Sequence, residues 1–181
     1  FVENTIHRVD LLRYLTGDDF EAISAFYVAR DPGEGPEPMN LPHVYNVNYR
    51  FAGGITANAT TSRVMLEAKV SRRELLVISD DSLVEWSKGK VVENGAVVWK
   101  ADENTNAFAL QARAFVEAVR SGDRSKTLSP YGNGINSLAA VLGANLSAER
   151  GGELVRVVDL VSGRVNYRVP SAENVSDHRF S

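Results

Sequence analysis

Polar and apolar residues follow a helical period at the start of the chain. At about 100° per residue, one narrow stripe of the helix would be polar. This stripe consists of Glu3, His7, Asp10 and Tyr14. Most of the remaining circumference is apolar, namely Ile6, Val9, Leu11, Leu12 and Leu15. We therefore predict a largely buried helix over 3–17 that ends at Gly17 and carries an acid, an imidazole and a second acid in line.

The clearest strand pattern is an alternation of apolar and polar residues on both sides of Ala52-Gly53-Gly54. The apolar positions are Tyr45, Val47, Tyr49 and Phe51 before the turn, and Ile55, Ala57 and Ala59 after it. The polar positions are Asn46, Asn48, Arg50, Thr56, Asn58, Thr60 and Ser62. We predict an antiparallel hairpin over 44–62 with one apolar face. Because the polar face has few full charges, we expect it to meet solvent, a hydrophilic ligand or another subunit.

The other segments complete an α+β pattern, because strands and helices are segregated along the chain rather than strictly alternating. Predicted strands are 20–30, 74–79, 82–86, 90–93, 96–100, 153–160 and 164–169, and predicted helices are 105–120, capped by Asn104 or Thr105, and 131–150. Residues expected to face the core are Phe108, Ala112, Phe115 and Val119 in the first helix and Ile135, Leu138, Leu142 and Leu146 in the second. Residues 31–42 are Pro-rich and predict a loop, either a solvated connection or a flap over a site. We expect one large, open, mainly antiparallel sheet with helices on one face and the other face free for a partner.

Bulk properties narrow the functional class. A length of 181 residues suits a single domain, and a net charge of −3 without a basic block argues against a nucleic-acid partner. No apolar run approaches the roughly 20 residues of a membrane span. The absence of cysteine excludes disulfides and thiolate chemistry, and no signal-peptide pattern is present, so we expect a cytoplasmic protein. Because the chain starts at Phe1, almost inside a helix, we expect it to be the C-terminal piece of a longer polypeptide.

The polar stripe of the first helix is the candidate for chemistry. Glu3 lies four residues before His7 and Asp10 three after it, so both acids would adjoin the imidazole. A carboxylate beside histidine fixes its tautomer and raises its basicity, as a general base requires. The alternative is a polar seam between packed helices. We predict no metal site, because the other histidines, His43 and His178, are far away in sequence.

The segment 132–137 (GNGINS) has the spacing of a dinucleotide-binding turn. Ser129-Pro130 precedes it instead of a strand, and no βαβ unit surrounds it, so the required context fails. We predict that these glycines belong to a first helical turn or to a close packing contact.

Several motifs together resemble the Gfo/Idh/MocA oxidoreductases, the glucose–fructose oxidoreductase and inositol dehydrogenase family. The motifs are 3–17 (ENTIHRVDLLRYLTG), 114–122 (AFVEAVRSG), 129–134 (SPYGNG) and 146–152 (LSAERGG). The resemblance implies a glyceraldehyde-3-phosphate dehydrogenase-like C-terminal domain spanning 1–181, which shapes the substrate pocket and makes oligomer contacts. It implies that NAD or NADP is bound mainly by a preceding Rossmann domain. That domain's Gly-rich turn and the family's Glu-Lys-Pro segment with its catalytic lysine do not occur in this chain.

The resemblance also implies roles for the stripe. His7 matches the family's proposed proton acceptor, and Glu3 matches the preceding acid, which is usually Asp in inositol dehydrogenase-like members. Asp10 is expected to be structural, and Tyr14 to bind substrate or to be structural. The expected substrate is a sugar, cyclitol or polyol, the hairpin face is expected to bind it or to form a homo-oligomer interface, and the isolated chain is expected to be inactive. The alternative is a non-enzymatic ligand-sensing or assembly domain with the same fold.

Overall fold

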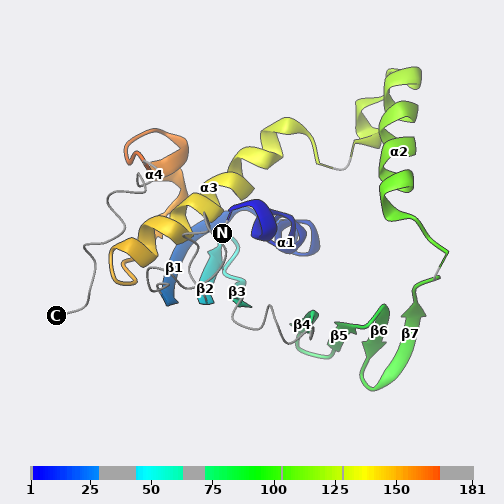
Figure 1. Cartoon of the computed structure of the whole chain (residues 1–181), viewed down its shortest axis with the longest axis horizontal. Helices are drawn as coiled ribbons and strands as arrows, with labels where there is room; N and C mark the ends of the chain where they lie inside the picture. The colour runs from blue at the N-terminus through cyan, green and yellow to red at the C-terminus, as the bar shows by residue number, and fades with distance from the viewer. Residues whose placement is uncertain (1, 29–43, 63–71, 103, 128, 168–181) are drawn as a thin grey trace, which may run out of the picture. The chain divides into compact units, whose positions relative to one another are not determined.

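The computed structural model describes residues 2–28, 44–62, 72–102, 104–127 and 129–167 (Figure 1). The chain divides into two compact units, which we treat separately. The first unit contains Phe1–Met65 and Ser129–Ser181, and the second contains Leu66–Leu128. The predicted loop 31–42 and the histidines His43 and His178 lie outside the described residues.

The first unit contains a four-stranded antiparallel sheet with the order β3-β2-β1-β8. Its strands are β1 (Phe20–Val28), β2 (Val44–Phe51), β3 (Thr56–Ser62) and β8 (Val155–Arg156). The predicted hairpin is confirmed, since β2 and β3 pair in register from Val44↔Ser62 to Arg50↔Thr56. Tyr45, Val47, Tyr49 and Phe51 are buried as predicted, whereas Ile55 lies before β3 and is 47% exposed.

Helices α1 (Val2–Thr16) and α3 (Tyr131–Glu149) form the core with the apolar side of this sheet (Figure 1). Small residues give α3 a close approach to β1. A Cβ atom added to Gly143 would lie only 3.0 Å from Ile23 Cδ1. Ser147 also joins α3 to β1, because its hydroxyl accepts from the Ala25 N–H at 2.8 Å and donates to the Glu153 carbonyl at 2.6 Å. Ser147 thereby provides a hydrogen-bond acceptor for the Ala25 N–H, which lies beyond the residues of β1 that pair with β8.

Helix α1 is buried along one side only, so the prediction of a largely buried helix is wrong. Thr5 and Val9 are buried, but Leu11 and Leu15 are 43% and 49% exposed. Apolar composition did not reveal which side would meet the sheet and α3. The predicted end is confirmed, because Gly17 has a φ of 65° and its N–H donates to the Arg13 carbonyl at 2.8 Å.

The inward side of α3 also differs from the prediction. Leu146 is buried, but Ile135 and Leu138 are 44% and 41% exposed. The buried positions are instead mainly small, namely Ser137, Ala139, Ala140, Val141, Gly143, Ala144 and Ser147. Close packing on β1 selects small side chains, so the largest apolar residues did not mark the contact face.

The segment after Gly152 was predicted to be a strand over 153–160, which is wrong. Only β8 is extended, and α4 (Val157–Val161) follows at once. Val157 is buried and Leu160 packs against the core, and their spacing places both on one side of a helix. The strand predicted at 164–169 does not form over its described residues 164–167.

The second unit contains an antiparallel meander with the order β4-β5-β6-β7. Its strands are β4 (Glu74–Ile78), β5 (Leu83–Ser87), β6 (Lys90–Glu93) and β7 (Ala96–Lys100). Lys88-Gly89 and Asn94-Gly95 form two of the turns of this meander, and all four residues have positive φ, as type I′ turns require. The α+β class is confirmed, but with two four-stranded sheets in place of one large sheet.

Helix α2 (Ala107–Ser121) lies in the same unit and is followed by a short 3₁₀ turn, Arg124–Lys126. Asn106 caps α2 by accepting from the Ala109 N–H at 3.1 Å, so the prediction of Asn104 or Thr105 is wrong. The side chains predicted to face the core are exposed instead, with Phe108 at 83% and Phe115 at 65%. No helix in the described part of the chain is long and apolar enough to cross a membrane.

Burial raises the pKa of two core tyrosines. Tyr49 is 2% exposed, and its hydroxyl has no hydrogen-bond partner among the described residues. Burial also raises the pKa of Tyr45, and the neighbouring Tyr167, Tyr27 and Glu149 raise it further. The neutral phenol is therefore favoured in the folded state.

The free energy of unfolding is expected to fall as the pH rises above 10, the ordinary pKa of tyrosine. Above this pH the unfolded chain loses phenol protons that the folded chain keeps, so unfolding becomes more favourable. Denaturant titrations at a series of alkaline pH values measure the slope of the free energy of unfolding against pH. Tyr49→Phe should make the slope shallower, whereas Tyr131→Phe, at a position 91% exposed, should not. Equal slopes for Tyr49→Phe and the unmodified protein would contradict the assignment.

Candidate functional site

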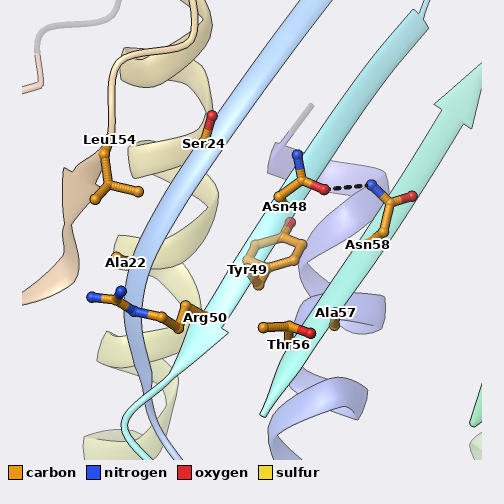
Figure 2. A pocket seen from close by; sticks show the side chains of 9 residues that line it. All are labelled: Ala22, Ser24, Asn48, Tyr49, Arg50, Thr56, Ala57, Asn58 and Leu154. Atoms are coloured by element: carbon orange, nitrogen blue, oxygen red, sulfur yellow. Dashed lines mark hydrogen bonds between the residues drawn. The ribbon is translucent and has the colours of Figure 1, made fainter. Parts of the chain in front are cut away.

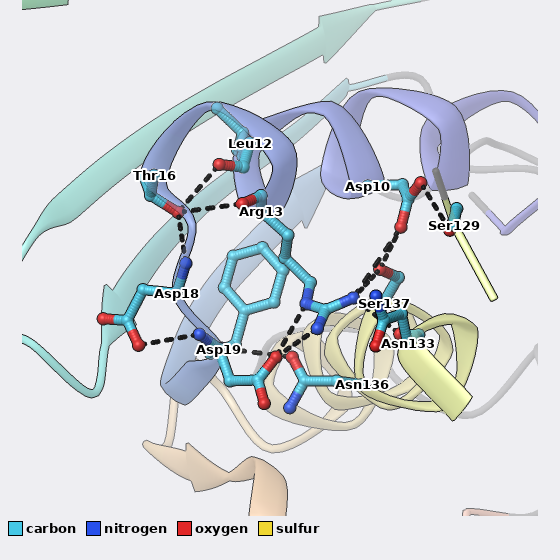
Figure 3. Close-up of polar contacts among 11 residues, drawn as sticks. Asp10, Leu12, Arg13, Thr16, Asp18, Asp19, Ser129, Asn133, Asn136 and Ser137 are labelled. Atoms are coloured by element: carbon cyan, nitrogen blue, oxygen red, sulfur yellow. Dashed lines mark hydrogen bonds and ion pairs between the residues drawn. The ribbon is translucent and has the colours of Figure 1, made fainter. Parts of the chain in front are cut away.

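The predicted polar stripe of α1 divides into two parts. His7 is exposed, and Tyr14 is 64% exposed. Asp10 is only partly exposed and points to α3 (Figure 3). The side chain of Glu3 lies outside the described residues, so its pairing with His7 stays a prediction.

Asp10 is engaged through both carboxylate oxygens. The Ser137 hydroxyl donates to Oδ1 at 2.7 Å, and the Ser129 hydroxyl donates to Oδ2 at 3.4 Å (Figure 3). Both serines come from α3 or the residues that lead into it. These contacts support a structural role for Asp10.

Arg13 extends this contact along α1 and was missed by the sequence analysis. Its Nη1 donates to the Asn133 carbonyl at 2.6 Å and to the Ser137 hydroxyl at 3.4 Å, and lies 3.9 Å from Asp10 Oδ1. Its Nε donates to Asp19 at 2.9 Å. The side chain is only 12% exposed. The i,i+3 spacing of Asp10 and Arg13 was a signal for an ion pair, but nothing in the sequence pointed to α3 as the common partner.

The polar face of the hairpin is brought together as predicted. Cross-strand pairs are Asn46↔Thr60, Asn48↔Asn58 and Arg50↔Thr56. Asn58 Nδ2 donates to Asn48 Oδ1 at 2.8 Å (Figure 2), and Thr60 Oγ1 donates to Asn46 Oδ1 at 2.9 Å. Arg50 binds both carboxylate oxygens of Glu21 at 2.9 and 3.0 Å. The face is therefore polar, internally bonded and nearly neutral.

A shallow depression of about 360 Å³ lies on this face (Figure 2). Of the predicted residues, Asn48, Arg50, Thr56 and Asn58 line it. Ser24 and Leu154 also line it and were missed, because their contribution depends on β1 and on the chain before β8. The depression offers amide, hydroxyl and guanidinium groups to a hydrophilic ligand or to a second protein surface.

The glycines of the segment 132–137 belong to a helix in the structure. Gly132 and Gly134 lie in the first turns of α3, which follows Pro130 and not a strand, so the predicted helical-turn interpretation is confirmed. No Cβ clash explains either glycine, so a close packing contact is not the reason for them. The described residues contain no group of three or more His, Cys, Asp or Glu side chains suited to a metal.

A family model described as the GFO/IDH/MocA C-terminal domain matches residues 1–83. The predicted resemblance to this oxidoreductase family is confirmed. The matched residues include α1 with His7 and the hairpin with its polar face. No curated protein matches the chain.

Solved structures of oxidoreductases share the fold. An oxidoreductase from Thermotoga maritima aligns with a TM-score of 0.69 at 21% identity, covering 87% of this chain and 44% of the other. The UDP-N-acetylglucosamine 3-dehydrogenase GnnA from Acidithiobacillus ferrooxidans gives 0.67 at 20% identity, covering 81% and 46%. The WlbA dehydrogenase from Bordetella pertussis, in complex with NADH and UDP-GlcNAcA, gives 0.60 at 16% identity, covering 86% and 44%. The chain thus spans about half the length of the solved structures it matches.

Truncation of the hairpin amides is expected to have little effect on stability. Asn58→Ala removes a solvent-exposed hydrogen bond to Asn48 and a partly buried one to the Val47 carbonyl from an exposed side chain, so the free energy of unfolding should change by about 1 kcal/mol or less. Val47→Ala on the opposite, buried face is the control and should cost about 2 kcal/mol. Chemical denaturation measures both. A loss from Asn58→Ala as large as that from Val47→Ala would mean that the polar face is needed for folding.

Proposed function

We propose that this chain is the substrate-binding and oligomerisation domain of an NAD(P)-dependent oxidoreductase that acts on a sugar, cyclitol or polyol. The family match over residues 1–83 is the observation that carries the proposal, because the matched residues include the helix with His7. In support, the solved neighbours are about twice as long as the chain, and two of them are named as dehydrogenases of, or in complex with, UDP-linked sugars. The nucleotide would be held by a preceding domain, as the resemblance to the family implies. A cytoplasmic location stays a prediction.

His7 is proposed as the general base. When bound, the cofactor supplies the acceptor for the hydride, and the residues of this chain bind the substrate and remove the hydroxyl proton. An exposed imidazole on α1 is accessible to a substrate hydroxyl, and the Asp10 carboxylate is already bonded to Ser137 and Ser129. Glu3 is proposed to orient the imidazole or to bind a substrate hydroxyl.

The test is His7→Asn in the complete protein that carries this domain. Turnover should fall about 10²- to 10⁴-fold, the range typical of a lost general base. The melting temperature should stay unchanged, because the side chain is exposed. Arg8→Gln is the matched control, since Arg8 is the adjacent exposed residue of α1, and it should retain turnover. Near-normal turnover in His7→Asn would refute the assignment of the base.

The polar sheet face supports a second role in assembly. The face is uncovered by the described residues, and its charged groups Arg50 and Glu21 are already paired. We propose that it meets the same face of a second copy. A non-enzymatic assembly or ligand-sensing domain would use the same face. The lysine of the family's Glu-Lys-Pro segment, in the preceding domain, distinguishes an enzyme from such a domain. Its absence from the complete protein would favour the non-enzymatic function.

Lysine substitutions on this face should dissociate the oligomer. In Asn48→Lys/Asn58→Lys, like charges from two copies would meet in the interface and oppose association. Sedimentation should show a smaller species than for the unmodified protein. Asn166→Lys, at another exposed position of the first unit, should leave the oligomer intact. If the double variant keeps the same mass as the control, the oligomer contact lies elsewhere.

A further inference from the structure

We propose that Ser137 and Arg13 are positioning residues that fix the rotation of α1 about its axis and thereby the direction of the His7 imidazole. Asp10 takes no part in proton transfer and acts as the anchor of this contact. The inference rests on the proposed role of His7 as the base. It assigns to α3 a function beyond packing.

The geometry of the helix connects the anchor to the imidazole. Asp10 follows His7 by three residues, so the two side chains are offset by about 60° around the axis and by one turn along it. Because Asp10 is held against α3, His7 must lie at the margin of the contact between the helices, where it is exposed. Any rotation of α1 that breaks the Asp10 contact moves the imidazole by a similar angle.

Apolar packing alone would not set this rotation. Val9, with the partly buried Ile6 and Leu12, packs α1 against the core, but apolar contacts are non-directional. Hydrogen bonds require defined distances and angles, and those to charged groups are the stronger ones. The contact joins two charged side chains of α1, Asp10 and Arg13, to a hydroxyl and a backbone carbonyl of α3.

Ser137 is the centre of the contact because it interacts with both charges. Its hydroxyl donates to Asp10 at 2.7 Å and accepts from Arg13 at 3.4 Å, and the residue is 1% exposed (Figure 3). Exclusion of water strengthens such bonds and makes their loss costly. Arg13 is held in turn by the Asn133 carbonyl and by Asp19. The network therefore resists rotation of α1 in either direction.

The chain contains a matched control for Ser137. Ser147 lies on the same helix, is 0% exposed, and also makes two hydrogen bonds through its hydroxyl. Its partners are Ala25 and Glu153, which do not belong to α1. Ser137→Ala and Ser147→Ala thus remove the same group from equally buried sites, and only the first should disturb α1.

The first experiment compares these variants in the complete enzyme. Ser137→Ala should lower kcat about 10- to 100-fold, as expected for a misplaced catalytic group, with a smaller change in KM. Ser147→Ala should lower the melting temperature without lowering kcat. The proposal is overturned if both variants lower kcat equally, or if Ser137→Ala leaves kcat unchanged.

The second experiment separates an anchor from a proton carrier. Asp10→Asn keeps a carbonyl oxygen that can accept from the Ser137 hydroxyl, so most of the turnover should remain, whereas Asp10→Ala should behave like Ser137→Ala. If Asp10→Asn is as inactive as Asp10→Ala, the carboxylate itself is required and the anchor role is wrong.

A third readout does not depend on turnover. The His7 ring signal in a proton–nitrogen NMR spectrum, identified by its loss in His7→Asn, should move in Ser137→Ala and stay in place in Ser147→Ala. If His7→Asn keeps full turnover, the proposed base is wrong, yet this signal still decides whether Ser137 positions the imidazole. An unmoved signal in Ser137→Ala would overturn the positioning role itself.

Discussion

The close approach of α3 to β1 is the contact on which the first unit depends. Gly143 and the small residues around it bring the helix so near that an added Cβ would lie 3.0 Å from Ile23. Ser147 completes the contact, because its hydroxyl accepts a hydrogen bond from the Ala25 N–H beyond the part of β1 that pairs with β8. Because α3 occupies one side of the sheet, the hairpin is buried on its aromatic side and open on its amide side. The position of α3 also determines where Ser137 can meet α1.

The two polar regions of this unit differ in how their groups are satisfied. In the contact between α1 and α3, charged side chains are bonded to a buried hydroxyl and to the backbone, so the arrangement is rigid and specific. On the open sheet face, amides and hydroxyls bond mainly to each other across the strands. Such groups can exchange these bonds for those of a ligand or a second surface at little net cost. These differences agree with the proposed roles, in which the first region orients His7 and the second recognises a ligand or a second copy.

Local patterns predicted much of the fold because their physical causes are local. Alternation in 44–51 identified the buried aromatic side of β2, and Gly17 marked the end of α1, which needs positive φ. The motifs around His7 led to the family resemblance, which the match over residues 1–83 confirmed. The candidate residues of the hairpin face lie together because strand period and turn determine the register.

What the sequence by itself determined was the existence of α1 and the hairpin, the order of polar groups on each, and the family resemblance. Only the tertiary structure decided which sides of the helices are buried. Ile135 and Leu138 are exposed while small residues are buried, because the close approach of α3 to β1 leaves room for small side chains only. The tertiary structure also decided that the valine-rich segment Val157–Val161 forms the helix α4 and not a strand. It likewise decided that Asp10 bonds to Ser137 of α3, more than a hundred residues away in the chain. Partners this distant in sequence are set by packing, which no periodicity in the chain encodes.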